Sequence, residues 1–308
     1  MPVPAGNPTT VQGVALGRRL YYDPILSGDS TQSCAGCHRY GRAFSDADAF
    51  SFGIDGMAGT RNAPALVNPG WLPFAFWDGR VTSLEDQARV PVADPIEMHA
   101  DWGDVVARLQ RHPSYPDMFG RAFGTSTVTQ DLVVRAIAQF ERTMVSSSSR
   151  FDRYNRNEID LTPMEKAGQA LFFSEVGDCF HCHGNVLGTD NRFHNVGADP
   201  ANADPGRAAV TGQPQDAGLF KTPTLRNVAF TAPYFHNARY NTLREVIEHY
   251  NNGVSGVPNL DPLIRPAGVG LGMRSGQIDT LLAFVLTLSD SSFLADTSLG
   301  PPGPWPGP

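Results

Sequence analysis

The amino-acid sequence predicts a mainly α-helical fold of two related domains with long loops and few short strands. Several stretches combine helix start signals with apolar residues at helical spacing, which predicts the helices. The 31 Gly and 25 Pro among 308 residues indicate many turns and irregular connections. A short phrase that occurs twice predicts that the two domains are related.

Four helices are predicted from their N-terminal signals. Thr129 can cap a helix over residues 131–145, and Ser275 can cap a last helix that ends at Leu288. The segments Thr162-Pro163-Met164-Glu165 and Thr242-Leu243-Arg244-Glu245 are capping boxes, and the first also has Pro at the first helical position.

The repeated phrase, Gly-x-x-Leu-aromatic-aromatic, occupies residues 17–22 and 168–173. Each copy precedes a Cys-x-x-Cys-His motif, and the two motifs contain all four cysteines of the chain. The polar run at 146–149 is a plausible boundary, so we expect an N-terminal domain over 1–148 and a C-terminal domain over 149–295. Residues 296–308 are rich in Pro and Gly and are expected to form a flexible tail.

Each Cys-x-x-Cys-His motif is typical of covalent haem. Two thiols three residues apart can add to the vinyl groups of one porphyrin, and the next His can bind its iron. A zinc site or a structural disulfide is the rival interpretation, but neither requires a His directly after both cysteine pairs. The sequence therefore predicts two cytochrome c-like domains with two covalent haems. The attachment residues are Cys34, Cys37, Cys179 and Cys182, and the iron ligands are His38 and His183.

Charge and hydropathy limit the partners. The formal net charge of −7 argues against nucleic acid, because phosphate binding needs a basic surface. No apolar stretch approaches the roughly 18 residues of a membrane span, and the longest candidate, Ile278 to Leu288, contains polar residues and is typical of a buried helix. Since c-type haem is attached outside the bacterial cytoplasm and residues 1–4 open directly into polar chain, we expect a mature periplasmic protein without its leader.

With these motifs placed, the chain resembles the bacterial dihaem cytochrome c peroxidases, the family that includes MauG and MbnH, from about Pro8 to Asp290. The resemblance implies a peroxide-reactive N-terminal haem and a C-terminal haem that holds or delivers electrons. Family members often form homodimers. The matching signatures are Asn62-Ala63-Pro64, Phe76-Trp77-Asp78-Gly79-Arg80, Leu84-Glu85-Asp86-Gln87, Pro95-Ile96-Glu97-Met98, Phe220-Lys221-Thr222-Pro223-Thr224-Leu225-Arg226-Asn227 and Thr231-Ala232-Pro233-Tyr234.

The resemblance implies three catalytic residues. Trp77 would lie between the haems and shorten the electron's longest jump through protein, although a Trp can also simply pack in a core. Gln87 and Glu97 match a pair ten residues apart on the open side of the first haem. Glu97 would move a proton between the two oxygens of peroxide, and Gln87 would orient peroxide or water. Outside its motif, Glu97 would be interpreted as a solvated surface residue.

One iron ligand of the family's peroxidases is replaced here. In those enzymes a Gly-His step follows the first haem motif, and its His blocks the oxidised first haem. This chain has Gly53-Ile54 instead, and isoleucine cannot bind iron. His99 and His112 lie outside that stretch and are interpreted as surface or structural residues. We therefore expect His38 to be the only protein ligand of the first iron, which would react with peroxide without prior reduction.

The opposite ligand of the second iron is implied by position. In the family it lies eight residues after the Thr of a Thr-Leu-x-Glu helix start, where the peroxidases have Met and MauG has Tyr. Counting from Thr242 reaches Tyr250. Leu243, Val246 and Ile247 would share one apolar helix face with Tyr250, which supports this assignment.

The sequence offers three alternatives to Tyr250 as this ligand. His249 would point about 100° away, towards the polar side of the helix. Met273 is a rival because a thioether is a normal c-type ligand. Tyr250 could also be a buried residue that merely packs. An anionic tyrosinate stabilises oxidised iron whereas Met stabilises ferrous iron, so Tyr250 favours MauG-like chemistry.

The resemblance also implies a calcium ion between the haems. The family holds it with an Asn side chain, two backbone carbonyls and waters. Asn62, Thr231 and Pro233 match the positions that provide these oxygens.

Three functions are compatible with these residues. A MauG- or MbnH-like enzyme would use hydrogen peroxide to oxidise residues, above all Trp, of a partner protein. A periplasmic peroxidase would reduce hydrogen peroxide to water with electrons from a small c-type cytochrome or cupredoxin. A non-enzymatic electron carrier is the third, and an open face at His38 with Gln87 and Glu97 above it argues against this.

Overall fold

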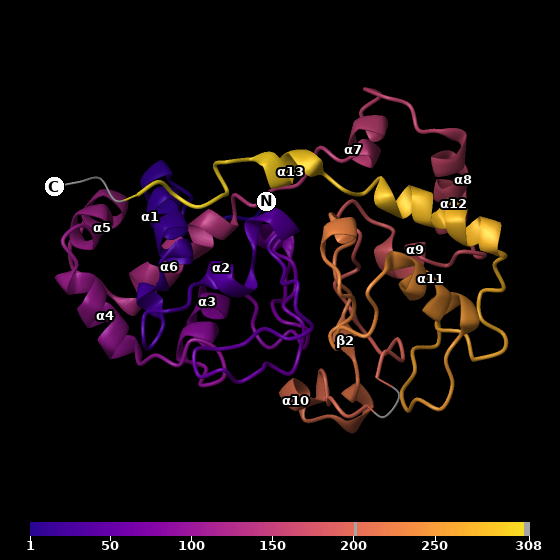
Figure 1. Cartoon of the computed structure of the whole chain (residues 1–308), viewed down its shortest axis with the longest axis horizontal. Helices are drawn as coiled ribbons and strands as arrows, with labels where there is room; N and C mark the ends of the chain where they lie inside the picture. Colours follow the sequence, from indigo (N-terminus) through magenta and orange to yellow (C-terminus); the bar gives the residue numbers. More distant parts are fainter. Residues whose placement is uncertain (200–201, 305–308) are drawn as a thin grey trace.

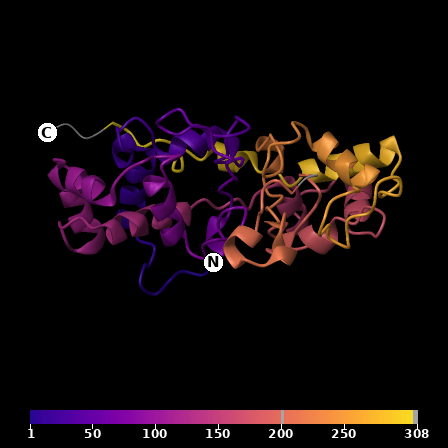
Figure 2. The same ribbon diagram turned by 90° about the horizontal axis from the view of Figure 1, so that it is seen from below.

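The computed structural model describes residues 1–199 and 202–304 and shows two lobes side by side along the long axis (Figure 1). The same two lobes are visible in the view from below (Figure 2). Among the described residues, the sole sheet pairs β1 (Phe193–His194) antiparallel with β2 (Phe220–Lys221), and the remaining regular elements are helices. The predicted mainly α fold with few short strands is confirmed.

The helices divide between the lobes. The N-terminal lobe contains α1 (Val11–Tyr22), α2 (Cys34–Cys37), α3 (Leu84–Ala93), α4 (Trp102–Arg111), α5 (Tyr115–Phe123) and α6 (Gln130–Glu141). The C-terminal lobe contains α7 (Arg150–Asn155), α8 (Pro163–Phe172), α9 (Phe180–His183), α10 (Ala208–Thr211), α11 (Leu243–Asn252) and α12 (Ser275–Leu286), and α13 (Ser291–Ala295) follows. Short 3-10 helices are η1 (Pro24–Leu26), η2 (Tyr40–Arg42), η3 (Pro69–Trp71), η4 (Pro214–Asp216) and η5 (Val228–Phe230).

A similar helix pair forms part of the core of each lobe and explains the repeated sequence phrase. α1 packs against α6, and α8 packs against α12. A Cβ added at Gly17 of α1 would lie 1.8 Å from the carbonyl oxygen of Ala136. A Cβ added at Gly168 of α8 would lie 2.1 Å from the carbonyl oxygen of Thr280. Both copies of the phrase begin with glycine because two helix backbones touch at that point.

Three predicted helix starts are correct. Thr129 caps α6, and the capping boxes at Thr162 and Thr242 are both formed. The α6 helix ends at Glu141 instead of residue 145, because the backbone N–H and the hydroxyl of Thr143 both donate to the carbonyl oxygen of Phe140.

The last helices differ from the prediction. Arg274, and not Ser275, is the N-cap of α12, which ends at Leu286. α13 follows it and returns to the N-terminal lobe, where Phe293 packs against Phe44 with 5.8 Å between the ring centroids. Among the described residues, no helix is both long and apolar enough to cross a membrane.

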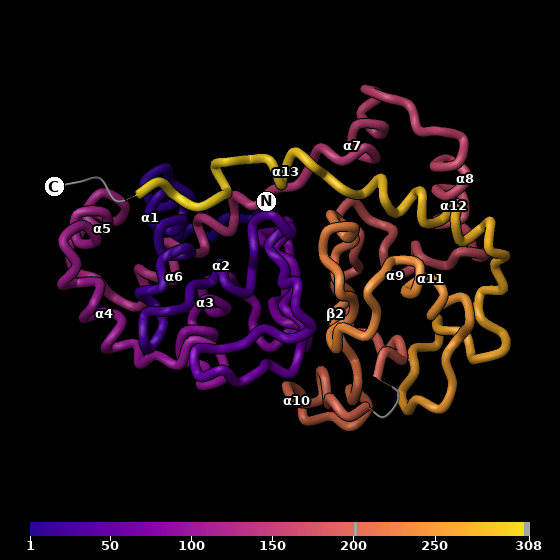
Figure 3. The backbone as a smooth tube through the Cα atoms, viewed as in Figure 1, coloured from indigo at the N-terminus to yellow at the C-terminus, as the bar shows by residue number. Residues whose placement is uncertain are grey.

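The first part of the predicted flexible tail contacts the N-terminal lobe. The chain from α13 runs back over the N-terminal lobe (Figure 3). Leu299 is 3% exposed, and its carbonyl oxygen accepts a hydrogen bond from the Tyr22 hydroxyl at 2.7 Å. Arg18 donates to the carbonyl oxygens of Thr297 and Gly300, each at 2.7 Å. Side chains of α1 thus donate hydrogen bonds to backbone carbonyl oxygens of this segment that have no partner within a helix. Residues 305–308 of the predicted tail lie outside the described residues.

Candidate functional site

The first Cys-x-x-Cys-His motif forms α2 and the residue that follows it. The backbone N–H of His38 donates to the carbonyl oxygen of Cys34 at 2.9 Å, and His38 Nδ1 lies 3.0 Å from the carbonyl oxygen of Phe44. Burial lowers the pKa of His38, which keeps the imidazole neutral. When Nδ1–H donates to Phe44, the lone pair is on Nε2 and can bind iron.

The second motif repeats this arrangement on α9. The backbone N–H of His183 donates to Cys179 at 3.0 Å, and His183 Nδ1 lies 2.6 Å from the carbonyl oxygen of Gly188. Burial lowers the pKa of His183 as well. Each motif therefore presents a neutral His, oriented by a backbone carbonyl, next to two thiols, and this donor set fits a c-type haem.

The rival interpretations of the cysteines do not fit the structure. The two pairs lie in different lobes, on α2 and α9 (Figure 1), so they do not form one four-cysteine zinc site. No disulfide joins any of the four cysteines. Cys182 lies near His194, but carboxylates hold both ring nitrogens of this His: Asp190 at 2.9 Å and Asp261 at 2.6 Å.

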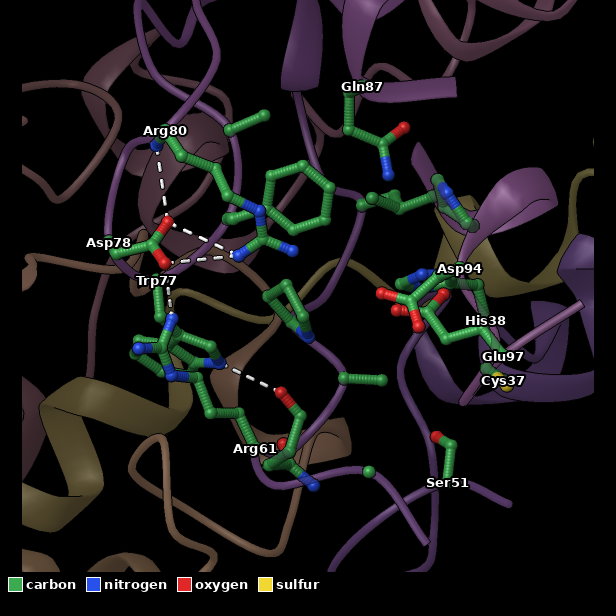
Figure 4. Close-up of a pocket in the computed structure, with 18 of the residues that line it drawn as sticks. Cys37, His38, Ser51, Arg61, Trp77, Asp78, Arg80, Gln87, Asp94 and Glu97 are labelled. Carbon is green, nitrogen blue, oxygen red and sulfur yellow. Dashed lines mark hydrogen bonds and ion pairs between the residues drawn. The ribbon is translucent and has the colours of Figure 1, made fainter. Parts of the chain in front are cut away.

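A cavity of about 420 Å³ lies next to the first motif. Cys37 and His38 line it, and Gln87 from α3 and Glu97 from the turn after α3 line the same space (Figure 4). Trp77 lies at the opposite side of the view from Cys37 (Figure 4). The structure thus brings the three residues expected to be catalytic into one cavity with the expected ligand of the first iron.

Backbone hydrogen bonds fix the position of Glu97, and its side chain is largely buried. Its N–H donates to the carbonyl oxygen of Asp94 at 3.1 Å, and its carbonyl oxygen accepts a hydrogen bond from the N–H of Ile54 at 3.0 Å. Burial raises the pKa of the Glu97 carboxyl, the charge of Asp94 raises it further, and Arg80 opposes both. A pKa moved towards neutrality suits a group that takes up and returns a proton.

His99 and His112 do not line the cavity that His38 lines. Ile54 lies on the loop that supports Glu97 and is not part of the cavity wall. His99 is exposed and pairs with a carboxylate, and His112 packs against an aromatic ring at the end of α4. Of the described residues that line the cavity, His38 is the only histidine.

Trp77 lies where the two lobes meet and is held from both sides. Its indole Nε1 donates to the carbonyl oxygen of Asn62 at 2.8 Å, within the N-terminal lobe. Its own carbonyl oxygen accepts a hydrogen bond from the N–H of Lys221 at 2.8 Å, from β2 of the C-terminal lobe. His236 of the C-terminal lobe meets the indole edge-on, with 6.3 Å between ring centroids.

Tyr250 projects from α11 into the region of the second motif. Burial raises the pKa of its phenol, and the nearby thiols of Cys182 and Cys179 raise it further. The phenol is therefore close enough to both cysteines to sense their charge, as expected for a residue on the opposite side of a shared haem.

The two rivals of Tyr250 have different surroundings. His249 is 8% exposed, so the expectation that it faces the polar side is wrong. Its Nε2 donates to the carbonyl oxygen of Val196 at 2.8 Å, and the Tyr240 hydroxyl lies 3.0 Å from its Nδ1, so neither nitrogen is free for iron. Met273 is buried in the apolar cluster of the C-terminal lobe that also contacts Cys179.

The three residues expected to bind calcium come from both lobes, and one hydrogen bond joins the segments that contain them. The backbone N–H of Asn62 donates to the carbonyl oxygen of His236 at 2.7 Å, which joins Asn62 to the segment that contains Thr231 and Pro233. The Asn62 amide nitrogen donates to two carbonyl oxygens of residues 48 and 49, at 3.1 and 3.2 Å. Its amide oxygen is the atom suited to a cation.

The sequence analysis missed three buried polar residues near the haem sites. Glu141 and Lys221 line the cavity beside the first motif, and burial raises the pKa of Glu141 to about 8. His236 has a buried Nε2 without a hydrogen-bond partner, and burial lowers its pKa to about 4. Only Lys221 could have been found from the sequence, because it lies inside the family signature that begins at Phe220.

Comparison with known proteins agrees with this geometry. A family model described as di-haem cytochrome c peroxidase matches residues 11–160. The cytochrome-c peroxidase IdrP1 of Pseudomonas sp. is 32% identical, and the match covers 100% of this chain and 89% of that protein. The chain belongs to the dihaem cytochrome c peroxidase family. The predicted resemblance is confirmed, and the protein is accordingly a dihaem oxidoreductase of the peroxidase class.

Relatives named cytochrome-c peroxidase and relatives named MauG both match this dihaem protein. MauG of Methylorubrum extorquens is 36% identical, and the match covers 94% of this chain and 81% of that protein. The crystal structure of a MauG-like protein associated with microbial copper homeostasis has a TM-score of 0.89 and 34% identity, and covers 98% of this chain and 97% of that chain. Family membership implies hydrogen peroxide and a protein partner or electron donor as reactants.

Proposed function

We propose that this protein uses hydrogen peroxide to oxidise residues, above all Trp, of a partner protein. Cys34 and Cys37 would carry the N-terminal haem, with His38 as its protein ligand, and this haem would supply the reaction with peroxide. Trp77 shares the oxidising equivalents with the C-terminal haem, which is carried by Cys179 and Cys182. When bound, the haems supply the two-electron reduction of peroxide and the storage of its oxidising equivalents.

The position of Tyr250 carries this proposal. Its phenol is buried near Cys179 and Cys182 of the second motif, in which a backbone carbonyl orients His183. An anionic oxygen ligand makes the second haem a poor store for a preloaded electron and a good partner in sharing oxidising equivalents. The structure of a MauG-like protein that covers nearly the whole chain supports the same branch.

The protein's own residues provide proton transfer and orientation at the first haem. Glu97, whose pKa burial raises, takes the proton from the near oxygen of peroxide and returns it to the far oxygen, which then leaves as water. Gln87 lines the same cavity and orients peroxide by hydrogen bonding. Ile54 lies outside the cavity wall, and His38 is the only histidine among the described residues that line it, so the first haem would be accessible to peroxide.

A second candidate is a peroxidase that reduces hydrogen peroxide to water with electrons from a small c-type cytochrome or cupredoxin. The match to cytochrome-c peroxidase IdrP1 over the whole chain favours it. In either function we propose a periplasmic location and a calcium ion held by Asn62, Thr231 and Pro233. The net charge of −7 favours a basic partner surface.

Substitution of Tyr250 distinguishes the two functions. Wild-type protein, Tyr250→Met and the control Tyr154→Met, on α7 of the same lobe, are prepared with both haems. We expect the wild-type protein to show a long-lived near-infrared absorption after one equivalent of peroxide and slow turnover with reduced cytochrome. Tyr250→Met should lose the absorption and gain turnover, while Tyr154→Met should behave like wild type.

Two outcomes contradict the proposal. Rapid cytochrome turnover by the wild-type protein, unchanged in Tyr250→Met, would identify a peroxidase instead. An electronic spectrum in which both ferric haems are low-spin and six-coordinate would show that the first iron is not open opposite His38.

A further inference from the structure

Lysine is rare in this chain and one of its copies is buried. Among 24 Lys and Arg residues, only Lys166 and Lys221 are lysines. Lys166 lies on the surface of α8 and pairs with Asp160 at 2.7 Å. Lys221, in contrast, lies on β2 and is 9% exposed. A chain that otherwise uses arginine therefore places a compact ammonium group inside the protein.

The ammonium group of Lys221 lies between the two haem sites. The residue lines the cavity of the first motif together with Trp77 and Asn62. Its charge also acts on His183, the expected ligand of the second iron, and it senses the carboxylate of Asp190 near that motif. The antiparallel pairing with Phe193 fixes the backbone of Lys221 at this position.

Lys221 has fewer partners than an ammonium group can use. Its Nζ donates to the carbonyl oxygen of Thr222 at 3.3 Å, and no carboxylate of the described residues forms an ion pair with it. An ammonium carries three donors and is strongly hydrated, so burial without an anion is unfavourable. Burial accordingly lowers the pKa of Lys221 to about 8.

The other cations of the same cavity already have carboxylate partners. Arg61 pairs with Asp78 and Asp204, each at 2.6 Å, and Arg80 pairs with Asp78 at 3.1 Å. Among the described residues that line the cavity, Lys221 is the remaining cation. The haems, which fit the two motifs, are the groups that bring further carboxylates to this place, because each porphyrin carries two propionates.

We propose that the ammonium group of Lys221 binds a haem propionate at the interface of the two lobes. The propionate completes the hydrogen bonding that Thr222 begins, and it neutralises the buried charge. The backbone N–H of the same residue holds the carbonyl oxygen of Trp77 at 2.8 Å. Lys221 thereby positions a haem edge and the bridging indole relative to each other, through its side chain and its backbone respectively.

Spectroelectrochemical titration of the haem-loaded protein tests this proposal, with four proteins compared. Lys221→Met removes the charge and keeps the length of the side chain, and Lys221→Arg keeps the charge. Lys166→Met is the matched control, because it removes the chain's other lysine from the surface. A cation at a propionate favours the reduced haem, so Lys221→Met should shift the midpoint potential of one haem to lower values than in the wild type.

The haem whose potential shifts identifies the source of the propionate. Lys221→Arg should retain most of the wild-type potential, and Lys166→Met all of it. If both haem potentials of Lys221→Met equal those of Lys166→Met, the proposal is overturned. The result does not depend on whether the enzyme oxidises a partner protein, because no peroxide or partner is used.

A crystal structure of the haem-loaded wild-type protein tests the same contact without a substitution, in case Lys221→Met does not fold. We expect Lys221 Nζ within about 3.2 Å of a propionate oxygen. An ammonium group that still contacts only the carbonyl oxygen of Thr222 would overturn the proposal.

Discussion

Replacing Glu141 with Gln should remove a pH dependence of folding stability that this buried carboxyl causes. Glu141 is the last residue of α6 and is 3% exposed, and its Oε2 has no hydrogen-bond partner. Burial raises the pKa of Glu141 to about 8, and the charge of Arg142 opposes this only in part. The guanidinium of Arg142 is directed to Glu85, at 2.5 Å.

The sign and size of the effect follow from this pKa. In the unfolded chain Glu141 releases its proton near pH 4.3, whereas the folded protein keeps it up to a pH of about 8. The stability that the protonated carboxyl contributes is complete below about pH 4 and is lost as the pH rises through about 8. A difference of one bound proton is worth about 1.4 kcal/mol per pH unit. Between pH 5 and 7 the wild type should therefore lose up to about 2.7 kcal/mol relative to Glu141→Gln.

Urea denaturation of the haem-loaded protein at several pH values between about 5 and 7 measures this difference. Glu158→Gln is the control. The hydrogen bond from Arg156 lowers the pKa of Glu158 on the surface, so its contribution changes only at lower pH. The free energies of unfolding of Glu158→Gln and wild type should differ by a constant over this range. Parallel pH profiles for Glu141→Gln and wild type would refute the reasoning, because Glu141 would then be ionised in the folded protein.

Three further predictions concern the cavity and the helix pairs. Glu97→Gln should slow the reaction with hydrogen peroxide by about 10²–10⁴-fold in stopped-flow absorbance. The wild-type rate should fall as the pH falls through the raised pKa of Glu97, because only the ionised carboxyl accepts a proton, and a loss below tenfold would contradict this role. Trp77→Phe should leave that rate unchanged but slow the spectral change of the second haem; equal rates for both proteins would exclude Trp77 as the bridge. Gly168→Ala should cost about 1–3 kcal/mol of unfolding free energy, because the new Cβ would lie 2.1 Å from the Thr280 carbonyl oxygen. Gly276→Ala, where nothing lies within 4 Å, is the matched control and should cost less than Gly168→Ala.

Local signals in the sequence predict this structure better than long-range ones. The capping boxes at Thr162 and Thr242 act over three residues, and both form as predicted. The phrase that begins at Gly17 and Gly168 predicts a repeat, but its reason is a contact with a helix far along the chain. The angular spacing of residues on a helix predicts that His249 faces a polar side. In the structure this side is buried, and His249 donates to the carbonyl oxygen of Val196, which is distant in sequence.

The same limit applies to charge and to the tail. Pro and Gly content is consistent with the irregular backbone at residues 296–304. It does not reveal that Arg18 and Tyr22 bind the carbonyl groups of this segment. Likewise, Lys221 and Glu141 look like surface residues in the sequence, because their burial depends on how the lobe interface and the α1–α6 pair are assembled.

The two haem sites have the same arrangement at the expected iron ligand, so their difference must come from the residues that surround each motif. His38 and His183 each lie with Nδ1 against a backbone carbonyl oxygen, at 3.0 and 2.6 Å, and burial lowers the pKa of both. Beside the first motif, α3 and the turn after it place Gln87 and Glu97 around a cavity that His38 also lines. Near the second motif, α11 directs a phenol towards the cysteines instead. Under the proposed function, the segments beside each motif therefore set the division of labour between two similar domains. Glu97, after α3, and Tyr250, on α11, are accordingly the most informative residues to substitute.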